Sequence, residues 1–169
     1  MSRRVYLLLT VVTLSVYFVM VLWTLPKISA AAGGLLPFDL RPWGYTPGEA
    51  AAFLSALSEA GRSLYSDVQL RLDTVYPPLL AVWICASAAR LFPRPVVWAI
   101  GLVAVVGMAA DLAENAAVAR LLDGFDAQTA QRAARWTLVK SAATTVALAV
   151  LLAGFVAWLW RKGRGRTTG

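Results

Sequence analysis

Four long apolar runs divide the chain, and each has the length that crosses a lipid bilayer. The first, at about residues 5–25, contains no charged side chain. The others lie at about residues 74–92, 96–118 and 136–160. Because roughly 20 apolar helical residues span a hydrocarbon core of about 30 Å, the pattern predicts four transmembrane helices. We therefore expect an all-α integral membrane protein, a four-transmembrane-helix bundle formed by a single domain at 1–162, with a disordered tail at 163–169.

The first apolar run has a rival interpretation as a cleavable signal peptide. Arg3 and Arg4 precede it, and a run of three alanines follows at 30–32. Its apolar stretch is longer than the core of roughly 7–15 residues that signal peptides have, so we favour a retained helix. Pro26 and Lys27 are expected to end this helix.

The connecting segment at 27–61 is expected to be an outer loop that contains one short helix. Glycine and proline interrupt its first half. Thr46 and Glu49 then have the spacing of a capping box, and Gly61 is a plausible helix stop. The pattern predicts an amphipathic helix at about 47–59, on the membrane surface or over the bundle.

Polar residues lead into the second apolar run and share one helix face. They recur at spacings of three, four and four residues, at Arg62, Tyr65, Gln69 and Asp73. Pro77 and Pro78 follow within the run. Because proline has no backbone N–H, carbonyl groups one turn earlier are expected to need partners from neighbouring helices or water.

The net charge of +7 lies at the ends of the apolar runs, in a pattern that argues against nucleic-acid binding. Eight basic residues lie on the side that both termini share: Arg3, Arg4, Arg90, Arg94, Arg161, Lys162, Arg164 and Arg166. The opposite side has a similar number, spread over longer loops among most of the acids. The positive-inside rule therefore predicts cytoplasmic termini and basic anchors that face anionic lipid.

The scarcity of cysteine and histidine narrows the chemistry that is expected. Cys85 is the single cysteine, so no intrachain disulfide can form. Histidine is absent, which argues against most zinc hydrolase and haem designs. We expect no metal site and no cofactor.

Ionisable residues from three helices are expected at one depth of the membrane. Asp111 lies fifteen residues after Val96, a rise of roughly 22 Å from the cytoplasmic side. Asp73 lies where the second span enters from the outer side, and Lys140 lies one turn inside the outer end of the fourth span. Charged side chains that face lipid cost several kcal/mol, so these three are expected to turn inward.

The spacing around these residues extends the predicted pocket. Asp111, Glu114 and Asn115 share a helix face, as do Lys140 and Ser141 with their neighbours Thr137 and Thr144. We expect Lys140 to pair with Asp111 or Glu114. Asp73, Gln69 and Tyr65 would line the opposite wall, and Arg62 would close the outer rim.

This constellation has the composition of a proton-transfer site. Three acids near one lysine in a low dielectric would leave at least one carboxyl protonated, beside ionised neighbours. A protonated carboxyl is a competent general acid, and an ionised neighbour is a competent base. The candidate catalytic residues are Asp73, Asp111, Glu114 and Lys140. The candidate ligand-binding residues are Arg62, Tyr65, Gln69, Asn115 and Ser141.

Three functions fit these residues. The first is an outward-opening pocket that binds a membrane lipid or lipophilic small molecule and acts on it by acid–base chemistry. The second is a proton- or cation-coupled carrier or channel, for which a homodimer would supply enough helices. The third is a non-catalytic accessory subunit whose polar cluster only fixes helix register.

Several stretches together resemble a family of small bacterial four-span membrane proteins that has no established activity. They are Pro42–Thr46 with Glu49, Gly61–Arg62 with Tyr65, Gln69, Asp73 and Pro77, and then Asp111–Asn115 and Leu138–Ser141. The resemblance covers about residues 37–145 and implies a multi-pass protein of the bacterial inner membrane. A looser likeness to the emopamil-binding and sigma-2 receptor group rests on Gln69, Asp73 and Pro77, at a different spacing. It implies sterol-like or cationic amphiphilic ligands by fold-level analogy alone.

Overall fold

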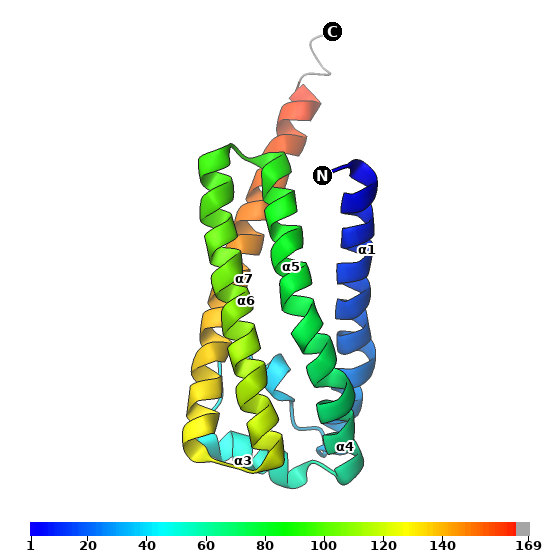
Figure 1. The fold of residues 1–169 in the computed structure, drawn as a ribbon, viewed down its shortest axis with the longest axis vertical. Helices are drawn as coiled ribbons and strands as arrows, with labels where there is room; N and C mark the ends of the chain where they lie inside the picture. The colour runs from blue at the N-terminus through cyan, green and yellow to red at the C-terminus, as the bar shows by residue number, and fades with distance from the viewer. Residues whose placement is uncertain (165–169) are drawn as a thin grey trace.

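The computed structural model describes residues 1–164, which contain helices and no strand. Four helical segments are long and apolar enough to cross a membrane: Arg3–Ala31, Glu59–Leu91, Arg94–Asp123 and Ala127–Arg164. They lie side by side along the long axis of the molecule (Figure 1). The end with residue 1 and the turn between the second and third segments is called the terminal end here. The opposite end, with the connecting segment and the turn at 124–126, is the loop end.

The first long segment continues past the predicted stop at Pro26. It consists of α1 (Arg3–Val19), a π-helical turn η1 (Met20–Thr24) and α2 (Leu25–Ala31). In the π turn, the backbone N–H of Leu25 donates to the carbonyl of Met20, five residues back. Pro26 therefore falls in the first turn of α2, where a missing backbone donor is tolerated. The predicted end at residues 25–27 was wrong for this reason.

The second long segment also contains a π-helical turn and begins earlier than predicted. It consists of α4 (Glu59–Leu64), η3 (Tyr65–Gln69) and α5 (Leu70–Leu91). Gly61 lies inside α4, so its predicted role as a helix stop was wrong. A Cβ atom at Gly61 would lie 2.6 Å from the Cβ of Ala31, so glycine here permits the close approach of α4 to α2.

The third and fourth long segments, α6 (Arg94–Asp123) and α7 (Ala127–Arg164), also extend beyond the predicted apolar runs. Asp126 caps α7 by accepting hydrogen bonds from the backbone N–H and hydroxyl of Thr129, at 2.8 and 2.6 Å. These hydrogen bonds lower the pKa of the Asp126 carboxyl. The cap at Asp126 therefore lets α7 begin with polar residues, before the predicted apolar run. Of the predicted disordered tail, 163–164 are helical and 165–169 lie outside the described residues.

The connecting segment folds back over the loop end and partly enters the space between the long helices. Its helix α3 (Pro47–Ala56) has the predicted capping box between Thr46 and Glu49, which lowers the pKa of the Glu49 carboxyl. Ala50, Phe53 and Leu54 of α3 are buried in the core of the loop end. The sequence left two placements open for this helix, on the membrane surface or over the bundle. In the structure, α3 lies over the long helices. The short 3-10 helix η2 (Phe38–Leu40) lies farther in, between the long helices (Figure 1).

Candidate functional site

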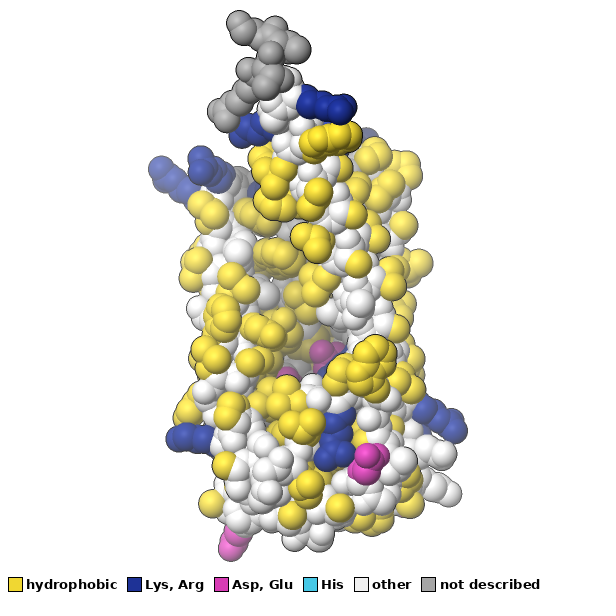
Figure 2. Space-filling model, turned by 180° about the vertical axis from the view of Figure 1, so that it is seen from behind, with side chains coloured by type: hydrophobic (Ala, Val, Ile, Leu, Met, Phe, Trp, Pro, Cys, Tyr) yellow, Lys and Arg dark blue, Asp and Glu magenta, His cyan; other side chains and the backbone are white. Residues whose placement is uncertain are grey.

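A cavity of about 350 Å³ lies among the first long segment, η2, α5, α6 and α7. Its charged lining residues are Asp39, Asp73, Asp111 and Lys140. The remaining walls are mainly apolar, with Ser141 and two threonines of α7 among them. Figure 2 shows the hollow on one flank of the molecule, with acidic side chains at its bottom. The volume lies in the range of about 300–1,000 Å³ that is typical of small-molecule sites.

Lys140 pairs with both predicted acids rather than with one of them. Its Nζ lies 3.0 Å from Oδ1 of Asp111 and 2.6 Å from Oε2 of Glu114. Thr137 donates its hydroxyl to the other oxygen of Glu114, Oε1, at 2.7 Å. The side chain of Glu114 is 2% exposed, compared with 18% for Asp111. Asp111 and Lys140 therefore face the cavity, and Glu114 and Thr137 hold them from behind.

Tyr45 adds a phenol behind the same ion cluster. Its side chain is buried beside Glu114 and Thr137, and burial, with the negative charge of Glu114, raises the pKa of the phenol. The phenol therefore stays protonated. Phe38 packs on its ring with a centroid distance of 4.8 Å, which ties this part of the cluster to η2.

A second carboxyl pair forms on the opposite wall, between Asp39 of η2 and Asp73 of α5. Both side chains line the cavity, and the charge of Asp39 acts directly on the Asp73 carboxyl. Tyr65 donates its hydroxyl to Oδ2 of Asp39 at 2.5 Å, and Gln69 donates its amide to Oδ2 of Asp73 at 2.7 Å. We call Asp39 and Asp73 the carboxyl dyad.

Asp39 was missed by the sequence reasoning. Helix periodicity identified the other acids, and Asp39 lies in a proline-interrupted loop where no periodicity exists. A signal was nevertheless present, because Asp39 is the only acid between residues 27 and 48 and its two neighbours, Phe38 and Leu40, are apolar. An isolated acid in an apolar turn is expected to have a partner.

The two π-helical turns meet beside the dyad. The hydroxyl of Thr24 in η1 donates to the side-chain oxygen of Gln69 in η3, and both side chains are fully buried. Gln69 therefore accepts from one turn of helix while it donates to Asp73. Single π turns inside α-helices occur often at functional sites, and here a pair of them orients one carboxyl.

Asn115 supplies the hydrogen bond that Pro77 cannot donate within α5. Pro77 has no N–H to donate to the carbonyl of Asp73, four residues earlier in α5. The side-chain amide of Asn115 in α6 donates to that carbonyl at 2.7 Å. This is the kind of neighbour that the paired prolines predicted. The bond also fixes the backbone of Asp73 relative to α6.

We expect the replacement of Asn115 by leucine to destabilise the protein by about 1–3 kcal/mol, because a buried carbonyl loses its donor. Pro77→Ala supplies a backbone N–H for the same carbonyl. The double variant should therefore lose less free energy of unfolding than the two single variants lose in sum, as measured by unfolding in detergent. Additive effects would contradict this assignment.

The other predicted site residues lie at different distances from the cavity. Asp73, Asp111, Lys140 and Ser141 line it, whereas Glu114, Tyr65 and Gln69 each contact a lining residue from behind. Arg62 does not line the cavity, so it does not have its predicted place at the rim. Its guanidinium donates to the backbone carbonyls of Leu122 and Leu54, at the ends of α6 and α3. A cation at a helix C-terminus is favourable, so Arg62 joins these helix ends.

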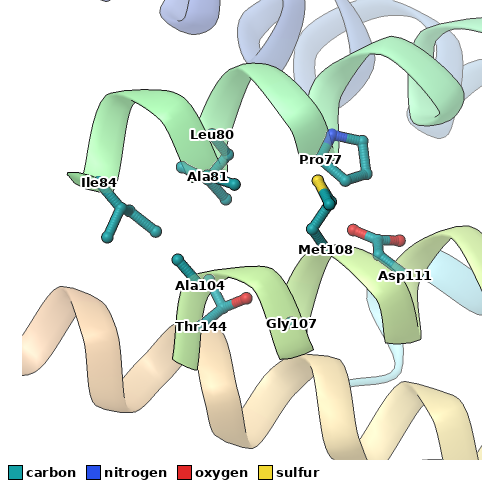
Figure 3. A pocket seen from close by; sticks show the side chains of 9 residues that line it. All are labelled: Pro77, Leu80, Ala81, Ile84, Ala104, Gly107, Met108, Asp111 and Thr144. Carbon is teal, nitrogen blue, oxygen red and sulfur yellow. The ribbon is translucent and has the colours of Figure 1, made fainter. Parts of the chain in front are cut away.

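A smaller cavity of about 10 Å³ adjoins the site on the side of the terminal end. Figure 3 shows side chains of α5, α6 and α7 around it, with Asp111 at one edge. Asp111 and Thr144 line both cavities. The space is close to the minimum that one water molecule needs. Toward the terminal end it meets an apolar cluster that includes Ile84, Ile100 and Leu151, so the polar lining stops near Asp111.

Comparison with protein-family models, curated proteins and solved structures finds no match for this chain. Within residues 1–164, no group of three or more His, Cys, Asp or Glu side chains is placed to hold a metal ion. The features that bear on function are the cavity, the ion cluster and the carboxyl dyad.

Proposed function

We propose that the chain is a multi-pass protein of the bacterial inner membrane, with both termini in the cytoplasm and four helices bundled across the bilayer. Large apolar side chains are exposed along the outward faces of the long helices. Figure 2 shows them over the flank of the molecule, with most basic side chains near its two ends. Compact groups of arginine and lysine at the terminal end support the orientation.

We further propose that the cavity binds a membrane lipid or lipophilic small molecule and acts on it by carboxylate acid–base chemistry. One observation supports this above all. Ionisable side chains from η2, α5, α6 and α7 converge on one cavity whose other walls are mainly apolar. Ionisable residues within spans are costly and mark functional sites by default.

The two groups of acids have different roles in this proposal. In this proposal the two carboxyl groups of the dyad share one proton, so the dyad can donate a proton to a substrate and accept one from it. Asp111, Lys140 and Glu114 form a fixed ion cluster that opposes charge developing on the substrate. Addition of a proton at one substrate atom and removal from another is an isomerisation, which needs no cofactor. Cyclisation and hydrolysis use the same groups.

A proton- or cation-coupled carrier is the second candidate, because the same acids could bind a cation. The apolar cluster between Asp111 and the terminal end argues against a continuous polar path in this conformation. A flux assay in proteoliposomes separates the two functions. Flux that depends on an ion gradient would favour the carrier.

The expected consequence in cells is a change in lipid composition. In cells that lack the native gene, the wild-type gene should alter the amount of at least one lipid, and Asp73→Asn and Asp111→Asn should not. Quantitative mass spectrometry of lipid extracts measures this. Each variant keeps an oxygen acceptor of the same shape, so both are expected to fold.

Asp67→Asn is the matched control, because Asp67 lies on the same long segment as Asp73 and is exposed. It should behave as wild type. Lipid compositions that do not differ among the empty strain, the wild type and the variants would contradict the enzymatic part of the proposal. Protein levels measured in the same membranes exclude loss of expression as the cause.

A further inference from the structure

The cavity is open on one flank, between α1 and α7. α1 packs against α5, and α7 packs against α6 and α5, whereas α1 and α7 make no comparable contact. The cavity reaches this gap, because side chains of both helices line it. Figure 2 shows the hollow on this flank of the molecule. We call the gap the lateral portal and define its rim by Tyr17, Val21, Thr145 and Leu148.

The other two directions are covered. Toward the loop end, η2 supplies Asp39 and Leu40 to the cavity wall, and the aromatic core of Phe38, Phe53 and Tyr65 lies behind them. Toward the terminal end, the apolar cluster closes the space on that side of Asp111. The open direction therefore points sideways, where the outward faces of both flanking helices have exposed apolar side chains such as Phe18 and Val146.

The charges at the base of the cavity select the head group. Asp39, Asp73 and Asp111 line it with Glu114 directly behind, and Lys140 is the single cation among these residues. These five groups are four acids and one base, so carboxyl groups outnumber cations at the base of the cavity. An anionic head group would therefore be repelled, whereas a group that donates hydrogen bonds would meet several carboxyl acceptors.

The walls select the rest of the ligand. Val21, Leu25 and Leu80 supply apolar wall to the cavity, and Leu148 lies at the rim. Exposed apolar side chains at the rim continue into the outward faces of α1 and α7. A hydrocarbon chain attached to a head group at the carboxyls can leave the cavity here without exposing polar backbone.

We propose that the substrate enters sideways from the bilayer through the lateral portal, and that it is an amphiphile with a hydroxyl or amine head group and a hydrocarbon chain. The head group lies against the carboxyl dyad, and the chain occupies the portal. This inference rests on the proposed function, since it names the route and the chemical class of ligand for the same cavity.

The test uses the full-length protein in lipid nanodiscs and three photoreactive probes. The probes have one hydrocarbon chain with a diazirine near its middle and end in an alcohol, an amine or a phosphate. Peptide mapping should place the label in 17–25 and 144–148. The alcohol or the amine, or both, should label at least about tenfold more than the phosphate, a difference of about 1.4 kcal/mol. Comparison of those two arms identifies the head group.

A portal variant with Val21→Trp and Thr145→Trp should reduce this labelling at least about tenfold, because two indoles fill the gap. The control places the same two indoles on the next residues, Leu22→Trp and Val146→Trp. Leu22 is 72% exposed and Val146 is 53% exposed, and neither lines the cavity. The control variant should label as the wild type does.

The outcomes separate this inference from the proposed function. Labelling that Asp73→Asn abolishes but the portal variant leaves unchanged would overturn the lateral route and keep the binding cavity. Equal labelling by the phosphate probe would overturn the head-group assignment. Labelling that is equal for all three probes and insensitive to Asp73→Asn would overturn the proposed function itself.

Discussion

Replacement of Lys140 by methionine is expected to destabilise the protein by about 3–5 kcal/mol, because removing one partner of a buried ion pair leaves the other uncompensated. Here two carboxyl groups depend on one ammonium. The Lys140 Nζ lies 3.0 Å from Asp111 and 2.6 Å from Glu114, and its side chain is 15% exposed. Methionine keeps a similar length and removes the charge, so the effect measures charge rather than volume.

A compensated variant should recover most of that stability. With Lys140→Met, Asp111→Asn and Glu114→Gln together, no uncompensated charge is left in the cluster, and the introduced glutamine can still accept the hydrogen bond that Thr137 donates. Replacement of a whole buried ion cluster by well-packed hydrophobic residues is often neutral or stabilising, and removal of every charge here likewise leaves no ion unpaired. Unfolding in detergent, followed by circular dichroism, measures the free energy of both variants.

The compensated variant also separates a functional cluster from a structural one. The proposed function predicts that it folds and yet fails to change lipid composition in cells, since the ion cluster is gone. If it folds and restores the wild-type lipid composition, the accessory-subunit function is favoured, and the ion cluster serves only to fix helix register. A Lys140→Met variant as stable as the wild type would contradict the burial argument itself.

The second large effect is expected at Asp39, which the sequence pattern did not identify. Asp39→Asn should lower the affinity for the alcohol or amine probe about 10- to 100-fold, because a hydrogen bond to a charged group contributes about 1.5–3 kcal/mol. The amide of asparagine cannot share a proton with Asp73 as a second carboxyl does. Equilibrium titration of the probe in nanodiscs measures the affinity.

The fold should tolerate Asp39→Asn. Tyr65 donates its hydroxyl to Asp39, and the side-chain oxygen of asparagine can accept the same hydrogen bond. Glu59→Gln is a suitable control, because Glu59 is an exposed acid at the start of α4. This variant should bind the alcohol or amine probe with the affinity of the wild type. A variant at Asp39 with unchanged affinity would contradict the role of the dyad, provided that Asp73→Asn still reduces binding.

The sequence predicted the long helices well because a span needs a continuous apolar run, which is visible without any tertiary information. It ended the first long helix too early, at 25, and began the second too late, at 74. Pro26 is typical of a helix stop, and only the π turn before it allows the helix to continue. Gly61 is also typical of a stop, and only the contact with Ala31 in three dimensions shows that it is a spacer.

The sequence predicted one wall of the site and, on the opposite wall, Asp73 with Gln69 and Tyr65, but it missed Asp39. Helix rise and i, i+3 spacing suffice to bring Asp111, Glu114 and Lys140 together, because all three lie on regular helices. Asp39 reaches Asp73 through a loop that folds back between the helices, and local spacing does not determine such a path. Asn115 was assigned to ligand binding, whereas its amide donates to the backbone of Asp73.

The most direct test of the central claim, that the cavity holds a lipophilic ligand on its carboxyl groups, is native mass spectrometry of gently solubilised protein. We expect the wild type and Asp67→Asn to retain one molecule of a hydroxyl- or amine-bearing lipid, and Asp39→Asn with Asp73→Asn to lose it. A wild-type protein that shows no bound species, or a lipid retained equally by the doubly substituted protein, would contradict the claim.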